Sequence, residues 1–154
     1  MDEIDRKILR ELQKDGRLSN VELAERVGLS PSPCLRRVKQ LEDSGIIRGY
    51  QALLDRNAVG LNLTIFAEVS VARHSRENAA LVQAALAALP EVVSCHMVSG
   101  RADFLAEIVV PDLAAYERLL TDHILTLDMV DDVRSNFSLR TVCQNKPTVL
   151  PDTL

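Results

Sequence analysis

The sequence predicts an α+β protein in two parts, an N-terminal three-helix domain of the winged helix-turn-helix type followed by a β-α-β-β-α-β sandwich. Two observations carry this prediction. Over residues 2–43 the apolar residues recur with helical spacing between recognisable caps, and from Leu61 onward they alternate as in a half-buried strand. The length of 154 residues suits two small domains.

The first helix is expected from Asp2 to about Lys14, where Asp15-Gly16 ends it. Its apolar stripe consists of Ile4, Ile8, Leu9 and Leu12. Three helices of this size suffice for a minimal core.

Two short helices follow, joined through a glycine turn. Ser19 and Glu22 form a capping box at the start of one helix, and Gly28 suits the left-handed conformation that ends it. Ser30 is expected to cap the next helix, whose first residue is Pro31. This pattern predicts a helix-turn-helix, which lays its second helix in the major groove of DNA.

The second of these helices has one apolar and one basic side. Cys34, Val38 and Leu41 form the expected buried stripe. Arg36 and Ser32 are expected to contact base edges, and Arg37 and Lys39 to grip phosphates. The residues predicted to face DNA are Ser30, Ser32, Pro33, Arg36, Arg37, Lys39 and Gln40. An ordinary solvated helix face is the alternative, and the caps, turn and stripe together favour DNA binding.

The charge and the cysteine content of the sequence argue against several classes of protein. The net charge of −4 divides into +1 up to Gly60 and −5 after it, which argues against a non-specific polyanion binder. Cys34, Cys95 and Cys143 are widely spaced, so we expect reduced thiols and neither a disulfide framework nor a metal site. We find no signal peptide and no apolar run of membrane-spanning length, and expect a cytoplasmic protein without a cofactor.

The second part has the periodicity of a ferredoxin-like sandwich, with both helices on one face of an antiparallel sheet. Its expected elements are a strand over 61–71, a helix over 76–88, strands over 92–98 and 104–110, a helix from 111 to about 127 and a last strand over 132–142. The predicted organisation is a DNA-binding domain (1–45), a strand-like linker (46–60), a sensing and oligomerisation domain (61–143) and a C-terminal tail (144–154).

The uncovered face of this sheet is expected to be mixed in polarity. Its residues are Phe66, Leu105 and Val109 together with Glu68, Glu107, Asn136 and Ser138. Such a face usually meets another protein surface, and a second copy of the chain is the simplest partner. A homodimer would place two recognition helices one DNA turn apart, as palindromic sites require.

The turn between the expected strands 92–98 and 104–110 is a candidate ligand site. Gly100 lets the backbone approach a ligand, and its amides suit a carboxylate. Asp103 suits an α-ammonium group, while Met97, Val98 or Phe104 would house an aliphatic side chain. A plain hairpin, with glycine and aspartate as turn formers, is the alternative.

Two motifs give the chain a family resemblance. They are L-S-P-S-P-C-L-R-R-V-K-Q-L-E-D-S-G-I-I (29–47) and S-G-R-A-D-F (99–104). With them the chain resembles the Lrp/AsnC transcriptional regulators over essentially its whole length. The resemblance implies DNA binding by the helix-turn-helix, sensing of an amino acid by the second domain, and dimers that associate into octamers.

The resemblance also implies where the effector binds, against the loop at an interface between subunits. The effector-binding residues named on this basis are Met97, Val98, Ser99, Gly100, Arg101, Asp103 and Phe104. Leucine or another aliphatic amino acid is favoured. Arg101 stands where many relatives carry an acidic residue, which leaves the effector's identity open.

Enzyme motifs are missing from the sequence. It has no phosphate-binding glycine loop, no histidine pair at metal spacing and no nucleophile elbow, so we name no catalytic residue and expect no enzyme. Two alternatives stay open: a DNA-organising protein without an effector, and an enzyme like the sirohaem decarboxylases, which share this architecture. The latter is disfavoured because the chain has two tyrosines and no second histidine near His96.

Overall fold

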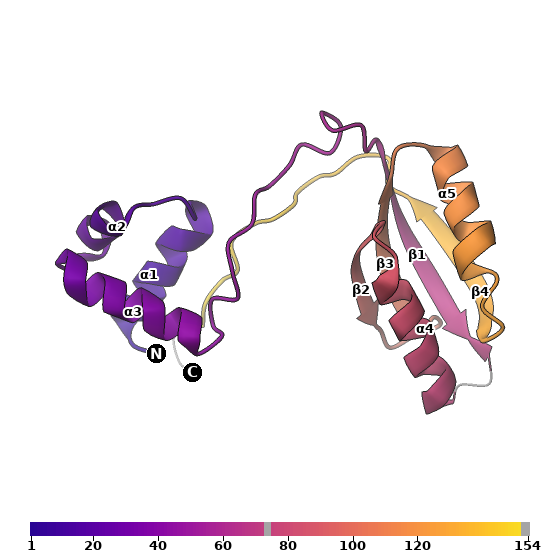
Figure 1. Ribbon diagram of the computed structural model, residues 1–154, viewed down its shortest axis with the longest axis horizontal. Coiled ribbons are helices and arrows are strands. Elements are labelled where there is room, and N and C mark those ends of the chain that lie inside the picture. Colours follow the sequence, from indigo (N-terminus) through magenta and orange to yellow (C-terminus); the bar gives the residue numbers. More distant parts are fainter. Residues whose placement is uncertain (73–74, 152–154) are drawn as a thin grey trace. The chain divides into compact units, whose positions relative to one another are not determined.

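The computed structural model describes residues 1–72 and 75–151, and the chain divides into two compact units. One unit combines Met1–Leu53 with Val142–Leu154, and the other comprises Leu54–Thr141 (Figure 1). The tail therefore groups with the N-terminal helices. No helix in the described part of the chain has the length and apolar character that crossing a membrane requires.

Three helices make up the N-terminal unit: α1 (Glu3–Lys14), α2 (Asn20–Val27) and α3 (Pro31–Asp43). The capping box of Ser19 and Glu22 is present, and a second one joins Asp2 and Asp5 at the start of α1. Gly28 ends α2 with φ 75°, a left-handed conformation that strongly favours glycine. The helix-turn-helix predicted from the sequence is confirmed.

Ser30 differs from its expected role. It occupies the N-cap position of α3, but its side chain makes no capping hydrogen bond. A capping side chain usually bonds the amide two or three positions on, and one of these two donors is missing here because Pro33 has no N–H. Instead, the Asn20 side-chain amide donates to the carbonyl oxygen of Pro31 at 2.8 Å and ties α2 to the start of α3.

The core of this unit is small and takes in the C-terminal segment. Its buried residues are Ile8, Leu9, Leu23, Ala24, Val27, Cys34 and Leu41. Leu150 packs against this cluster. Beside it, the Gln13 side chain donates to the carbonyl of Thr148 (3.2 Å) and accepts from its amide (2.6 Å). These contacts fix the tail to the helical unit.

The second unit is a four-stranded antiparallel sheet in the order β2-β3-β1-β4, with α4 and α5 on one face, as Figure 1 shows. Its elements are β1 (Leu63–Val71), α4 (Arg76–Ala88), β2 (Val92–Met97), β3 (Phe104–Val110), α5 (Leu113–Leu119), the π-helical turn η2 (Leu120–Ile124) and β4 (Val130–Phe137). The predicted order of strands and helices is confirmed.

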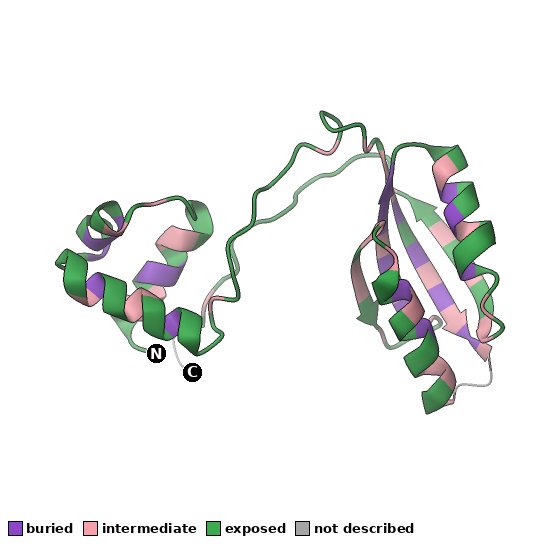
Figure 2. Ribbon diagram, in the orientation of Figure 1, coloured by how far each residue is buried: buried purple, intermediate pink, exposed green. Residues whose placement is uncertain are grey.

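Alternation along β1 divides the sheet into a covered and an open face. Ile65, Ala67 and Val69 are 0% exposed under the helices, whereas Phe66 on the open face is 39% exposed (Figure 2). Because β1 pairs with β3 and β4 on its two sides, its alternation fixes the facing of both neighbours.

Three expected segments differ in detail. The last strand covers Val130–Phe137 instead of 132–142, and Leu139, expected on the apolar side, is 97% exposed. The register with β1 ends with Phe137 opposite Ile65, and one further hydrogen bond runs from the Ser138 amide to the Thr64 carbonyl at 2.9 Å. Likewise 46–54 has no paired neighbour and forms no strand, and the last helix passes into the π-helical turn after Leu119.

The packing of the tail makes a testable prediction. Leu150→Ala is expected to lower the free energy of unfolding of the helical unit by about 1–2 kcal/mol, less than for a fully buried leucine because the site is only partly buried. Hydrogen exchange of the amides in α1–α3 measures this change. Val149→Ala is the matched control, since Val149 is 91% exposed. Equal exchange in the two variants would contradict the packing role of Leu150.

Candidate functional site

The outward face of α3 is basic and, apart from Leu35, polar, and it is free of acidic groups over the first three turns of the helix. Ser32, Arg36, Lys39 and Gln40 are all exposed, and the first acidic residue of the helix is Glu42. The positive end of the helix dipole adds to the charge of these side chains. The hydroxyl of Ser30, which makes no cap, lies at the same end of the helix. The face therefore suits a polyanion.

The other two residues predicted to face DNA are more enclosed. Pro33 is half-buried at the start of α3. The Arg37 guanidinium is held 2.7 Å from a carboxylate oxygen of Asp2 and 2.8 Å from one of Asp5, at the start of α1. Arg37 thus links α3 to α1, and both contacts are made by one nitrogen of its guanidinium, Nη1.

The ion pair affects the carboxyl group that it contacts. The pKa of Asp2 lies below its ordinary value because the group accepts a hydrogen bond from the Asp5 amide and, secondly, one from Arg37. The Asp2 side chain is therefore ionised at neutral pH and keeps Arg37 in place. The sequence could not reveal this contact, because it joins residues 35 positions apart.

The candidate effector loop joins β2 to β3 and is largely exposed. Gly100 has φ 135°, a conformation that L side chains rarely adopt, and it has open space where a Cβ would lie. Ser99 and Arg101 beside it are exposed, and Met97 is 65% exposed. Val98 is half-buried and donates its amide to the carbonyl of Asp103, which closes the hairpin.

Two of the predicted effector residues take part in the fold itself. One carboxylate oxygen of Asp103 accepts the amide of Val71 at 2.7 Å, where the ladder between β1 and β4 is irregular. Phe104 differs from the expectation, since its ring is 1% exposed in the core beneath the helices. The reason is register: Phe104 lies opposite Val69 on the covered face. In this structure it adds no surface to the loop.

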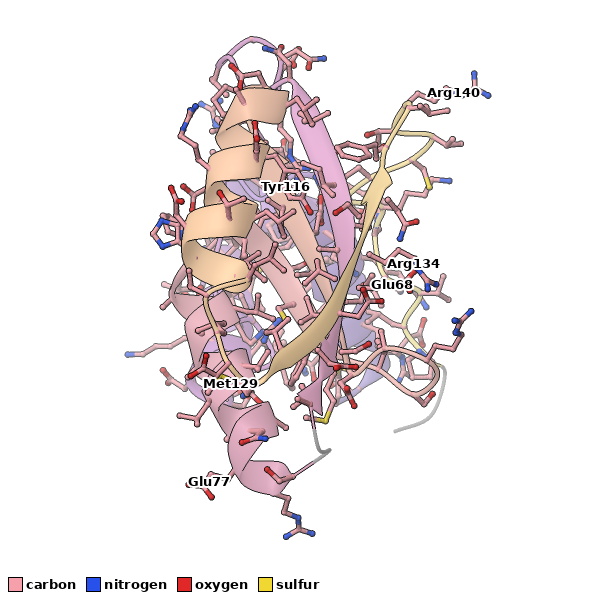
Figure 3. All side chains as sticks on the ribbon, turned by 90° about the vertical axis from the view of Figure 1, so that its right-hand side faces the viewer. Glu68, Glu77, Tyr116, Met129, Arg134 and Arg140 are labelled. Carbon is pink, nitrogen blue, oxygen red and sulfur yellow. The ribbon has the colours of Figure 1, made fainter. Side chains whose placement is uncertain are left out.

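A polar pocket next to the loop contains residues that the sequence did not single out for ligand binding. It measures about 50 Å³ and is lined by Glu68, Ser70, Arg101, Ala102 and Arg134. Register brings Arg134 opposite Glu68, and Figure 3 shows their side chains next to each other. The guanidinium lies 3.9 Å from a Glu68 oxygen. The two arginines make this pocket suitable for a small anionic group such as a carboxylate.

A larger, apolar cleft of about 440 Å³ lies at the opposite end of the sheet. It is lined by Asn62, Leu63, Pro111, Asp112, Leu113 and Phe137. The Asp112 carboxylate is already used, because it accepts the Ala115 amide at 2.8 Å as the cap of α5. The cleft therefore offers an aliphatic surface, whereas the loop offers charge.

Comparison with family models accounts for both units. A winged helix-turn-helix DNA-binding model matches residues 1–48, and an Lrp/AsnC ligand-binding domain model matches residues 64–148. The leucine-responsive regulatory proteins of Salmonella typhimurium and Escherichia coli K12 are each 45% identical over 150 residues, covering 97% of this chain and 92% of theirs.

Solved structures give the same result. A transcriptional regulator of Neisseria meningitidis, crystallised as a complex with L-Met, superposes with a TM-score of 0.94 at 42% identity, covering 100% of this chain and 99% of its own. An AsnC family regulator of Agrobacterium tumefaciens superposes with a TM-score of 0.89 at 40% identity, covering 98% and 97% of the two chains.

Proposed function

This chain belongs to the Lrp/AsnC family of transcriptional regulators, and from that premise we propose that an aliphatic amino acid, methionine or leucine, controls its binding to DNA. The DNA-binding domain and the amino-acid-binding domain of the family are both present. The observation that carries the proposal is the exposed glycine hairpin beside a pocket with two arginines.

Contacts with DNA are assigned to α3. Arg36 suits a guanine, because a guanidinium can donate to O6 and N7 together, and Ser32 lies close enough to the helix start to approach base edges. Lys39 would hold a phosphate, with Ser30, Pro33 and Gln40 completing the surface. Arg37 takes a secondary part, because Asp2 and Asp5 already hold it.

Effector contacts are assigned to the hairpin. Arg101 would receive the α-carboxylate together with the free amides around Gly100, and Met97 and Val98 would line the side chain. Asp103 orders the loop and offers negative charge to the ammonium group, while Phe104 supports it from the core. Proteins similar to this chain support the choice of ligand, since one was crystallised with L-Met and others are named for leucine.

The open sheet face supports a homodimer. It combines Phe66, 39% exposed, with the charged pair of Glu68 and Arg134, a mixture that suits a self-complementary interface. Two copies would present two α3 helices to a palindromic site, about 34 Å apart. In the proposed function the dimers associate into octamers. The protein acts in the cytoplasm as a regulator and catalyses no reaction.

Two substitutions on α3 test the DNA assignment on duplexes selected from a random library. Lys39→Ala is expected to weaken all sites alike and to reduce the salt slope of log K by about 2, because a bound homodimer loses one phosphate contact in each of its two subunits. Arg36→Ala is expected to relax the preference at one base pair by about 1–3 kcal/mol. Arg118→Ala, exposed on α5, is the control. Altered specificity with an intact salt slope in Lys39→Ala would overturn these roles.

The effector assignment predicts a change in thermal stability. Methionine or leucine at about 100 times its dissociation constant should add about 2.7 kcal/mol, enough to raise the melting temperature by several degrees. Arg101→Ala should lose most of the shift, while Arg118→Ala should keep it. No shift with any of the twenty amino acids would favour a DNA-organising protein without an effector. A shift that survives Arg101→Ala and fails in Leu113→Ala would move the site to the apolar cleft.

A further inference from the structure

The exposed face of α3 contains one apolar side chain that the DNA assignment leaves unexplained. Leu35 is 57% exposed in the second turn of the helix. It does not belong to the buried stripe, because Cys34 and Leu41 are 0% and 4% exposed on the other side. The helical core is therefore complete without Leu35.

Its position places Leu35 among the polar groups assigned to DNA. At 100° per residue it lies about 60° from Ser32 and about 40° from Lys39 around the helix axis. Side chains three and four positions apart are neighbours on a helix surface, so Leu35 borders the row of Ser32 and Lys39, both of which lie on the same side of it as Arg36. A helix seated in the major groove through this face brings Leu35 to the base edges.

We propose that Leu35 is a specificity-determining residue that contacts the 5-methyl group of a thymine in the major groove. This inference rests on the proposed DNA-binding function and deepens it. The methyl group of thymine is the apolar group that base pairs present in that groove, and it is the feature there that an aliphatic side chain can recognise. Against other bases, Leu35 would displace water from polar atoms without replacing their hydrogen bonds.

The surroundings of Leu35 favour DNA over a protein partner. A protein contact is usually built around a cluster of apolar residues from which water is excluded. On α3 Leu35 has Ser32 and Lys39 on one side and Pro31 and the half-buried Val38 on the other, with no acidic residue before Glu42. Leu35 is the one exposed large apolar side chain of α3, at the edge of its basic face, and this matches a polyanion that exposes methyl groups.

The test removes the thymine methyl group from the DNA and, separately, the leucine side chain from the protein. Duplexes selected by the parent protein are remade with deoxyuridine in place of each thymidine, which deletes only the 5-methyl group. When deoxyuridine replaces one particular thymidine of a half-site, we expect the parent protein to bind the duplex about fourfold more weakly than the unmodified duplex. This is the effect of losing one buried methyl group. Leu35→Ala should bind the unmodified duplex several-fold more weakly and should be insensitive to deoxyuridine at that position.

Controls separate this inference from the function on which it depends. Leu81→Ala on α4, where the leucine is 49% exposed, should keep both the affinity and the deoxyuridine penalty of the parent. If no position shows a penalty with the parent, or if Leu35→Ala shows the same penalty, the protein binds DNA but Leu35 reads no methyl group. If the parent selects no duplex at all, the DNA-binding assignment fails and takes this inference with it.

Discussion

The angle between α2 and α3 is the constraint on which DNA recognition by this chain depends. Gly28 sets it, because its left-handed conformation turns the chain at the end of α2 while its amide still bonds back to the helix. The hydrogen bond from the Asn20 side chain to the Pro31 carbonyl then holds the start of α3 against α2. A residue with a side chain at position 28 would be strained whatever space surrounds it.

Cross-contacts outside the turn hold α3 in the same position. Cys34 and Leu41 bury its inner side, and the ion pair from Arg37 to Asp2 and Asp5 joins it to α1. Basic residues on one helix consequently divide into two kinds. Arg37 stabilises the helix within the domain, whereas Arg36 and Lys39 remain directed to solvent, where a duplex can meet them.

Local signals in the sequence were enough for most of the fold. The capping box of Ser19 and Glu22, the glycine turn and the alternation from Leu61 each depend on residues close together in the chain, and the structure confirms them. The missing cap of Ser30 was not predicted, although Pro33 visibly removes one of the two amide donors that a cap can use. Features that depend on contacts between distant parts of the chain could not be predicted in this way.

The candidate site shows the same division between local and distant contacts. The exposed loop around Gly100 follows from the hairpin pattern, and the burial of Phe104 follows from the alternation that places Leu105 on the open face, since Phe104 then lies on the covered face opposite Val69. The polar pocket needs Arg134 opposite Glu68, a pairing between strands far apart in the chain. The role of Leu150 could not be predicted for the same reason, because it packs against helices that are more than 100 positions away in the sequence.

The proposed function requires that amino-acid binding and DNA binding are thermodynamically coupled, and a single binding measurement tests this coupling. The dissociation constant for a selected duplex is measured with and without saturating methionine or leucine, at fixed salt. We expect the dissociation constant for DNA to change by roughly fivefold or more, and the amino-acid affinity to change by the same factor when DNA is present, because coupling between two sites is reciprocal. A duplex affinity that is unchanged by an amino acid that binds the protein would contradict it.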